Sequence, residues 1–218
     1  MKMLFVFLFV FVGYTALHAQ KLPFQDEIAA FRKADSTNPP TAYPIVFTGS
    51  SSFRKWTGVK EAFPRYPVIN RGFGGSTLPD VIRYVDDVIF KYNPRQVVIY
   101  CGDNDLASSD TVTAHVVFRR FTTLYSMIRA KLPKVDILYV SIKPSPSRQQ
   151  LMPEMENANK LIASFISKQK HAAFADVYHA MLTHDGHIID GIWEGDKLHM
   201  NSKGYDIWQK VIAPYLVR

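Results

Sequence analysis

The chain contains a single cysteine, Cys101, in 218 residues, so no disulfide can form within it. Cys101 follows the apolar residues 97–100, a setting in which a thiol usually packs as a small buried hydrophobe. Internal repeats, low-complexity tracts and linkers are also missing, so one domain is expected. Hydrophobic residues make up 47% and charged residues 21% of the chain, a composition typical of globular rather than disordered proteins.

Concentrated positive charge is absent although the net charge is +7. The basic residues are spread along the chain or paired, as in Arg119-Arg120, and no basic stripe with interleaved aromatics or recognition-helix signature occurs. Weak attraction to anionic polymers follows from this charge. Nucleic-acid binding is not expected to be the function.

The first 19 residues have the features of a secretory signal peptide. Lys2 supplies a positive charge, residues 3–12 form an unbroken apolar stretch, and residues 13–19 are small and mixed before Gln20. The apolar stretch is shorter than the about 20 residues that a membrane-spanning helix needs, so no stable membrane span is expected. We therefore expect a signal peptide over residues 1–19 and a secreted or periplasmic domain over residues 20–218, with a retained N-terminal anchor as the alternative.

Five short apolar runs alternate with longer helical patterns. The runs are rich in β-branched and aromatic residues and lack polar alternation, which is typical of strands buried on both faces of a parallel sheet. The predicted strands are residues 43–47, 67–70, 96–101, 135–141 and 172–177. The predicted helices are residues 26–33, 78–90, 112–131, 154–168 and 203–216, the last capped by Asn201 or Ser202. This alternation predicts a doubly wound α/β sandwich.

Polar loops follow the first three predicted strands, at residues 49–52, 70–76 and 102–105. In open parallel sheets, ligands bind beyond the carboxyl ends of the strands. We therefore expect these three loops to form one site. Residues 143–145 and 177–179 follow the fourth and fifth strands, and the sequence leaves their roles open.

Ser51 is the candidate nucleophile. It follows a glycine at the end of a buried strand, and the residues after it can open a helix whose free N–H groups and dipole face a group bound to the serine. A serine hydroxyl needs a base to take its proton before it attacks. The alternative is that residues 50–52 only cap a helix or bind an anion.

His199 is the candidate base, and Asp196 stands three residues before it. In a turn, the carboxylate can bond one ring nitrogen, fix the tautomer and stabilise the imidazolium, leaving the other nitrogen for the serine. The alternative is a turn aspartate beside a surface histidine. The remaining histidines are weaker candidates because none has a carboxylate in so defined a turn: His115, His171, His179, His184 and His187. Residues 184–187 offer too few ligands for a metal site.

Three donors could stabilise the oxyanion of an acyl-transfer reaction. They are the backbone N–H of Ser51, a glycine N–H from Gly74-Gly75, and the side-chain amide of Asn104. The glycines could instead serve turn geometry that requires positive φ, and Asn104 could brace its own loop.

The order of these motifs resembles that of GDSL/SGNH hydrolases: Gly-x-Ser at 49–51, a glycine block at 72–75, Gly-x-Asn-Asp at 102–105 and Asp-x-x-His at 196–199. The resemblance extends from about residue 43 to the C-terminus. It implies a flavodoxin-like three-layer α/β/α sandwich with a five-stranded parallel sheet, and an esterase that uses neither metal nor organic cofactor. It further implies that Ser51 is the nucleophile, that Gly75 and Asn104 complete the oxyanion hole, and that Asp196 and His199 are the base pair.

The chain departs from the family at Ser50, where the family has aspartate beside the nucleophile. That aspartate is not the general base, so catalysis is expected to survive. Residues 70–76 and 204–208 resemble the branch related to platelet-activating-factor acetylhydrolase, which implies short acyl esters, often acetyl groups on sugars or small lipids.

Two other functions remain open on the sequence: an acyltransferase that passes the acyl group to a sugar hydroxyl, and a non-catalytic module that binds phosphate or flavin. The substrate pocket is also open. Four aromatic residues near the motifs could wall an acyl or sugar pocket or belong to the core: Phe53, Trp56, Phe73 and Trp193.

Overall fold

The computed structural model describes residues 22–218 of the chain, and the predicted signal peptide lies outside the described residues. Five strands form one sheet in the order β2-β1-β3-β4-β5, and every neighbouring pair is parallel. The strands are β1 (Ile45–Gly49), β2 (Val68–Gly72), β3 (Gln96–Tyr100), β4 (Asp136–Val140) and β5 (Ala172–Ala175). This is the flavodoxin-like strand order, so the predicted five-stranded parallel sheet is confirmed.

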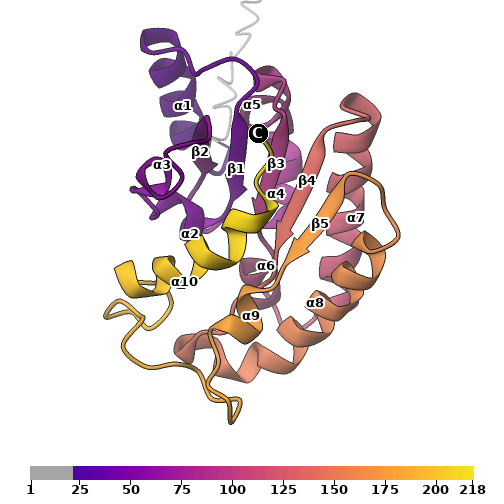
Figure 1. Ribbon diagram of the computed structural model, residues 1–218. Helices are drawn as coiled ribbons and strands as arrows, with labels where there is room; N and C mark the ends of the chain where they lie inside the picture. Colours follow the sequence, from indigo (N-terminus) through magenta and orange to yellow (C-terminus); the bar gives the residue numbers. More distant parts are fainter. Residues whose placement is uncertain (1–21) are drawn as a thin grey trace, which may run out of the picture.

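Helices cover both faces of the sheet (Figure 1). Along β3, Val97 and Ile99 belong to one hydrophobic cluster, whereas Val98 and Tyr100 belong to the other, because successive side chains of a strand point to opposite faces. One face is covered by α1 (Gln25–Thr37), α4 (Leu78–Arg83), α5 (Val85–Val88), α6 (Asp103–Ala107), α7 (Ala114–Lys131) and α8 (Met152–Ile166). The other is covered by α2 (Ser51–Arg54), α3 (Val59–Ala62), α9 (Val177–Ala180) and α10 (Ser202–Ile212). The three-layer α/β/α sandwich predicted from the sequence is confirmed.

The predicted helix over residues 78–90 is divided into α4, α5 and the 3-10 turn η1 (Phe90–Tyr92). The backbone leaves helical geometry at Tyr84 and Ile89. The hydroxyl of Tyr84 donates to the carbonyl of Pro23, 61 residues away, a tertiary contact that the local pattern does not contain. Two further 3-10 turns, η2 (Pro146–Leu151) and η3 (Ala213–Tyr215), precede α8 and follow α10.

The fifth predicted strand, residues 172–177, ends earlier than expected. It stops at Ala175 because Asp176 caps α9, accepting the backbone N–H of His179 at 3.1 Å. The first predicted strand, residues 43–47, begins and ends earlier than the observed strand β1. Tyr43 has a φ of 51°, and β1 begins only at Ile45.

Cys101 is fully buried at the end of β3, as expected, and burial raises the pKa of its thiol well above the ordinary value. Within residues 22–218, no helix is both long and apolar enough to cross a bilayer.

Gly49 allows the end of β1 to lie directly against β3. Its φ is 124°, and a Cβ at this position would lie 1.9 Å from the carbonyl oxygen of Tyr100. The backbone N–H of Ser50 then donates to that same oxygen at 2.9 Å. A glycine is therefore required at the point where the chain turns from the sheet into α2, and this turn delivers Ser51 to the carboxyl edge of the sheet.

Candidate active site

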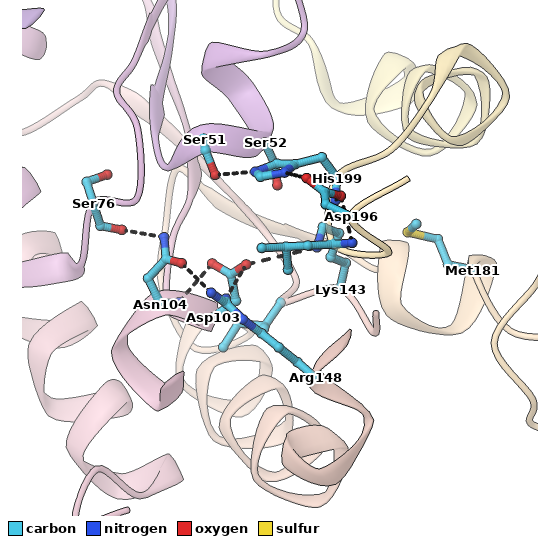
Figure 2. Close-up of polar contacts among 12 residues, drawn as sticks. Ser51, Ser52, Ser76, Asp103, Asn104, Lys143, Arg148, Met181, Asp196 and His199 are labelled. Carbon is cyan, nitrogen blue, oxygen red and sulfur yellow. Dashed lines mark hydrogen bonds and ion pairs between the residues drawn. The ribbon is translucent and has the colours of Figure 1, made fainter. Parts of the chain in front are cut away.

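Ser51 is the first residue of α2, at the carboxyl end of β1. Its Oγ lies 2.8 Å from Nε2 of His199, 148 residues further along the chain. The two side chains that the sequence predicted as nucleophile and base are therefore in direct contact (Figure 2).

Asp196 holds the opposite side of the His199 ring. Its Oδ2 lies 2.5 Å from Nδ1 of His199, and its Oδ1 accepts the backbone N–H groups of His199 and Leu198 at 2.8 and 3.0 Å. Partial burial opposes ionisation of Asp196, but these hydrogen bonds outweigh it and hold the pKa of the carboxyl well below its usual range. A carboxylate at Nδ1 favours the tautomer with the proton on Nδ1, which leaves Nε2 free to accept the proton of Ser51.

The loop that carries this pair is fixed by its own backbone. The N–H of Glu194 donates to the carbonyl of His199 at 2.8 Å, and that of Asn201 donates to Ile192 at 3.1 Å. The side chain of Asn201 accepts the N–H groups of Lys203 and Gly204, so the predicted cap of the last helix is confirmed at Asn201. His199 is consequently held between a closed turn and the start of α10.

The three predicted oxyanion donors differ in their surroundings. Within residues 22–218, the backbone N–H groups of Ser51 and Gly75 donate to no acceptor of the chain, whereas that of Gly74 donates to Oε2 of Glu27 at 3.0 Å. Gly75 has a φ of 69°, which suits glycine. Asn104 donates one N–H of its amide to the carbonyl of Ser76 at 3.0 Å. Its other N–H remains for a ligand.

Figure 2 shows Ser76 and Asn104 on one side of Ser51, with His199 and Asp196 on the other. An ester carbonyl above Ser51 would have a base on one side and amide donors on the other. Such an arrangement can transfer an acyl group to the serine and stabilise the negative charge that develops on the carbonyl oxygen.

Three largely buried charged residues beside Asn104 form a group that the sequence did not predict: Asp103, Lys143 and Arg148. Nη2 of Arg148 donates to Oδ1 of Asn104 at 2.9 Å, and Nη1 of Arg148 lies 3.1 Å from Oδ2 of Asp103. Nζ of Lys143 lies 4.0 Å from the same oxygen and 5.5 Å from the centre of the Trp193 ring. Burial lowers the pKa of Lys143 to about 8, although Asp103 opposes the shift. The loop at residues 143–145 gave a signal for Lys143, but nothing local to Arg148 indicated that it would reach Asn104.

Helix α1 also reaches the site, which the sequence did not indicate. Oε2 of Glu27 accepts the N–H of Gly74 and forms an ion pair with Nε of Arg54, in both cases at 3.0 Å. Glu27 therefore links the glycine loop to the end of the helix that begins with Ser51.

Ser50, at the position of the family's aspartate, has a fully buried side chain. Its Oγ has no hydrogen-bond partner within the described part of the chain.

Asp105, the last residue of Gly-x-Asn-Asp, stabilises the fold around the site. It accepts the N–H of Leu78 at 2.9 Å and pairs with Arg120 at 2.7 Å.

The aromatic residues considered as pocket walls are buried. Phe53 and Phe73 have no exposed surface and belong to the two cores, so neither can line a substrate pocket. Trp193 packs under Lys143 and donates to the carbonyl of Ile189 at 2.8 Å. Trp56 alone borders a groove, where its ring stacks on Tyr205 with centroids 5.1 Å apart.

The expectation that no other histidine has a carboxylate in a comparable turn was wrong. Asp176 stands three residues before His179, with its Oδ2 2.6 Å from the His179 Nδ1. The Asp-x-x-His spacing forms this turn at both places, although only Asp176 of the two aspartates caps a helix. His179 is largely exposed, with 66% of its side chain accessible, and among the described residues no serine hydroxyl bonds its ring. His184 is fully exposed, and within residues 22–218 no group of three or more metal-ligating side chains comes together.

A groove of about 790 Å³ adjoins Asp196 on the side of α2, α3 and α10. Its lining combines apolar and aromatic residues, Trp56, Ala62, Met200 and Tyr205, with polar ones: Lys55, Thr57, Glu194, Asp196, Asn201, Ser202, Asp206 and Gln209. Nζ of Lys55 lies 3.8 Å from Oδ2 of Asp196, so the groove begins at the carboxylate that bonds His199.

A parallel α/β sandwich with a serine, a histidine and an aspartate in line at its carboxyl edge defines a protein built like a serine hydrolase. Over residues 28–207 the chain matches the model of the GDSL-like lipase/acylhydrolase family. The chain belongs to this family and is a hydrolase with acylhydrolase or esterase function.

Solved structures agree with this assignment of the fold. A protein from Streptococcus pneumoniae, described as a candidate platelet activating factor, superposes with a TM-score of 0.76 at 19% identity, over 88% of this chain and 92% of that one. A GDSL-like lipase from Bacteroides thetaiotaomicron gives 0.69 at 20% identity, over 86% and 97%. An acetyl-xylooligosaccharide esterase from Geobacillus gives 0.64 at 12% identity, over 79% and 94%. A comparison with curated protein sequences gave no match.

Proposed function

We propose that this protein is a serine esterase that removes short acyl groups, acetyl above all, from hydroxyl-rich alcohols such as carbohydrates. The observation that carries the proposal is the line of contacts from Ser51 Oγ to His199 Nε2 at 2.8 Å and from His199 Nδ1 to Asp196 Oδ2 at 2.5 Å. A serine hydroxyl becomes an effective nucleophile when a positioned base takes its proton.

The reaction proceeds in two acyl transfers. His199 takes the proton of Ser51 as its Oγ attacks the ester carbonyl, and the N–H groups of Ser51, Gly75 and Asn104 stabilise the oxyanion. His199 then gives the proton to the leaving alcohol, and an acyl-enzyme remains on Ser51. A water molecule, deprotonated by His199, attacks this ester, and the carboxylic acid leaves as Ser51 regains its proton.

The groove beside Asp196, with both polar and aromatic side chains in its lining, supports a hydroxyl-rich leaving group. Its amide, carboxylate and hydroxyl side chains can bond sugar hydroxyls, and the half-buried Tyr205, which stacks on the buried Trp56, can pack against a sugar ring. The names of two structural neighbours, an acetyl-xylooligosaccharide esterase and a family 3 carbohydrate esterase, are consistent with this substrate class.

The proposal is tested by hydrolysis of nitrophenyl acetate, butyrate and octanoate, followed by acetylated xylo-oligosaccharides and an acetylated small lipid. We expect the acetate to be hydrolysed fastest and the oligosaccharides to be preferred over the lipid. Ser51→Ala should abolish turnover and labelling by a fluorophosphonate, while Ser50→Ala, a change at the adjacent serine, should retain both. Labelling that survives in Ser51→Ala would show that another residue is the nucleophile.

We also propose that residues 1–19 direct export to the periplasm or the medium and are then removed. Mass spectrometry of the protein recovered outside the cytoplasm should give an N-terminus at Gln20. Recovery of the full-length chain in the membrane fraction would favour a retained anchor instead.

A further inference from the structure

The side-chain amide of Asn104 is bonded at both ends. Its Nδ2 donates to the carbonyl of Ser76 at 3.0 Å, and its Oδ1 accepts Nη2 of Arg148 at 2.9 Å. A carbonyl cannot donate and a guanidinium cannot accept, so the two partners together fix which end of the amide faces which way. Without Arg148, only the contact with Ser76 would distinguish the two orientations.

Arg148 is itself held in place by charge. Its Nη1 lies 3.1 Å from Oδ2 of Asp103, whose other oxygen accepts the backbone N–H of Asn104 at 3.0 Å. Only 16% of the Arg148 side chain and 5% of the Asp103 side chain are exposed. Asp103 thus contacts both the Arg148 guanidinium and the backbone of Asn104, while the guanidinium bonds the Asn104 side chain. These three contacts close a small ring of interactions (Figure 2).

The segment that carries Arg148 also contacts the histidine loop. Arg148 lies in η2, and the backbone N–H of its neighbour Ser147 donates to the carbonyl of Lys197 at 3.1 Å. Lys197 follows Asp196 directly. The same short turn therefore touches both sides of the site, the amide donor through Arg148 and the Asp-His turn through Ser147.

A cation at Oδ1 changes what the Asn104 amide can do. Hydrogen bonds to charged groups are stronger than neutral ones, and an amide polarised at its oxygen donates more strongly through its N–H groups. Buried ion pairs contribute little to stability on balance, because desolvation offsets their attraction. The Asp103–Arg148 pair therefore has its clearest physical effect on the amide that it orients.

We propose that Arg148 is a positioning residue that orients and polarises the Asn104 amide for the oxyanion formed at Ser51. This inference rests on the proposed function, because Asn104 has a catalytic role only if such an oxyanion forms. Arg148 need not touch the substrate, and Asp103 acts behind it by holding the guanidinium.

The experiment is a double-mutant cycle on nitrophenyl acetate hydrolysis, with Arg148→Met, Asn104→Ala and the combined variant. Arg148→Met should lower kcat by about 10- to 100-fold with little change in KM, since loss of a direct oxyanion donor costs about 10²- to 10³-fold in other enzymes. In the Asn104→Ala background the same change should have almost no further effect on kcat. Arg148→Lys, which keeps a charged donor, should lose less activity than Arg148→Met.

The control is Arg129→Met. Arg129 bonds the carbonyls of Pro133 and Val135, before the start of β4, whereas the site lies beyond the other end of that strand. The Arg129→Met change should leave kcat unchanged both in the otherwise unmodified protein and in the Asn104→Ala variant. If Arg148→Met is too unstable to assay, Arg148→Lys in the two Asn104 backgrounds gives the same comparison.

Equal losses from the Arg148 change in both backgrounds would overturn the inference, since Arg148 would then act independently of Asn104. An increase in KM at constant kcat would overturn it as well, because that result indicates substrate binding. Failure of the proposed function looks different: the unmodified protein would not hydrolyse the ester or react with fluorophosphonate, whatever residue stands at position 148.

Discussion

The hydroxyl of Ser51 and Nε2 of His199 lie 2.8 Å apart although 148 residues separate them in the chain. Ser51 is held by a turn that only Gly49 permits, and His199 by a turn closed on Asp196. Two independently rigid turns at one edge of the sheet thus meet within hydrogen-bonding distance. Neither side chain has to move for proton transfer to begin, which is the arrangement expected of a preorganised site.

The two Asp-x-x-His turns provide a matched test of the base. His199→Gln should lower kcat at least about 10³-fold, because within residues 22–218 the His199 ring is the one side chain that bonds the Ser51 hydroxyl, and Asp196→Asn should lower it by about 10²- to 10⁴-fold. His179→Gln and Asp176→Asn change the same kind of turn, but among the described residues no serine hydroxyl bonds the His179 ring, so both changes should leave kcat unchanged. Steady-state kinetics on nitrophenyl acetate measure both, and a comparable loss in the His179 variant would contradict the assignment.

The free energy of unfolding should change with pH in the alkaline range because of Lys143. Burial lowers its pKa to about 8, so between pH 8 and the ordinary value of 10.5 the unfolded chain holds a proton that the folded protein has released. The cost of burying the charge is fully present below pH 8 and is relieved as the pH rises. The free energy of unfolding should therefore increase relative to that of Lys143→Met, by about 2 kcal/mol between pH 7 and 9.5.

Urea unfolding of both proteins at several pH values measures this difference. Lys160→Met is the control, because Lys160 is exposed and, among the described residues, pairs only with Glu156 on the same helix. Its difference from the unmodified protein should stay constant over the same range. A constant difference for Lys143→Met would mean that the buried amine keeps its proton.

Glu27 ties helix α1 to the glycine loop. Glu27→Ala removes the acceptor of the Gly74 N–H and the partner of Arg54, and should lower kcat/KM by about tenfold as the loop next to Gly75 loosens. Glu27→Gln keeps an acceptor and should retain most of the activity. Glu61→Ala, an exposed change on α3, should have no effect. Full activity in Glu27→Ala would show that the loop is held without α1.

Gly49 should tolerate no side chain. In Gly49→Ala, the new Cβ would approach the carbonyl of Tyr100 to 1.9 Å at a φ of 124°, so the free energy of unfolding should fall by at least about 3 kcal/mol. Gly58→Ala has no neighbour closer than 4.0 Å and should cost less than about 1 kcal/mol. Thermal or urea unfolding compares them, and a mild effect at Gly49 would mean that β1 and β3 can separate at this edge.

Local patterns were enough to predict the sheet and its layers. Continuous apolar runs such as residues 96–101 are typical of strands covered on both faces, and a histidine three residues after an aspartate can form a closed turn wherever it occurs. The carboxyl-edge rule for parallel sheets then predicted that the loops of Ser51, Gly75 and Asn104 lie together, and the resemblance to GDSL/SGNH hydrolases placed His199 beside them. These features depend on residues close together in the sequence or on a general property of the fold.

Only the tertiary structure showed that the His199 ring, and not the His179 ring, bonds a serine hydroxyl, and that Phe53 and Phe73 belong to the core. It also decided that Glu27 and Arg148 reach the oxyanion side of the site. Long charged side chains extend several ångströms from backbones whose relative positions depend on packing of the whole sandwich. Their contacts therefore leave no local pattern, and they become visible only when the layers are assembled.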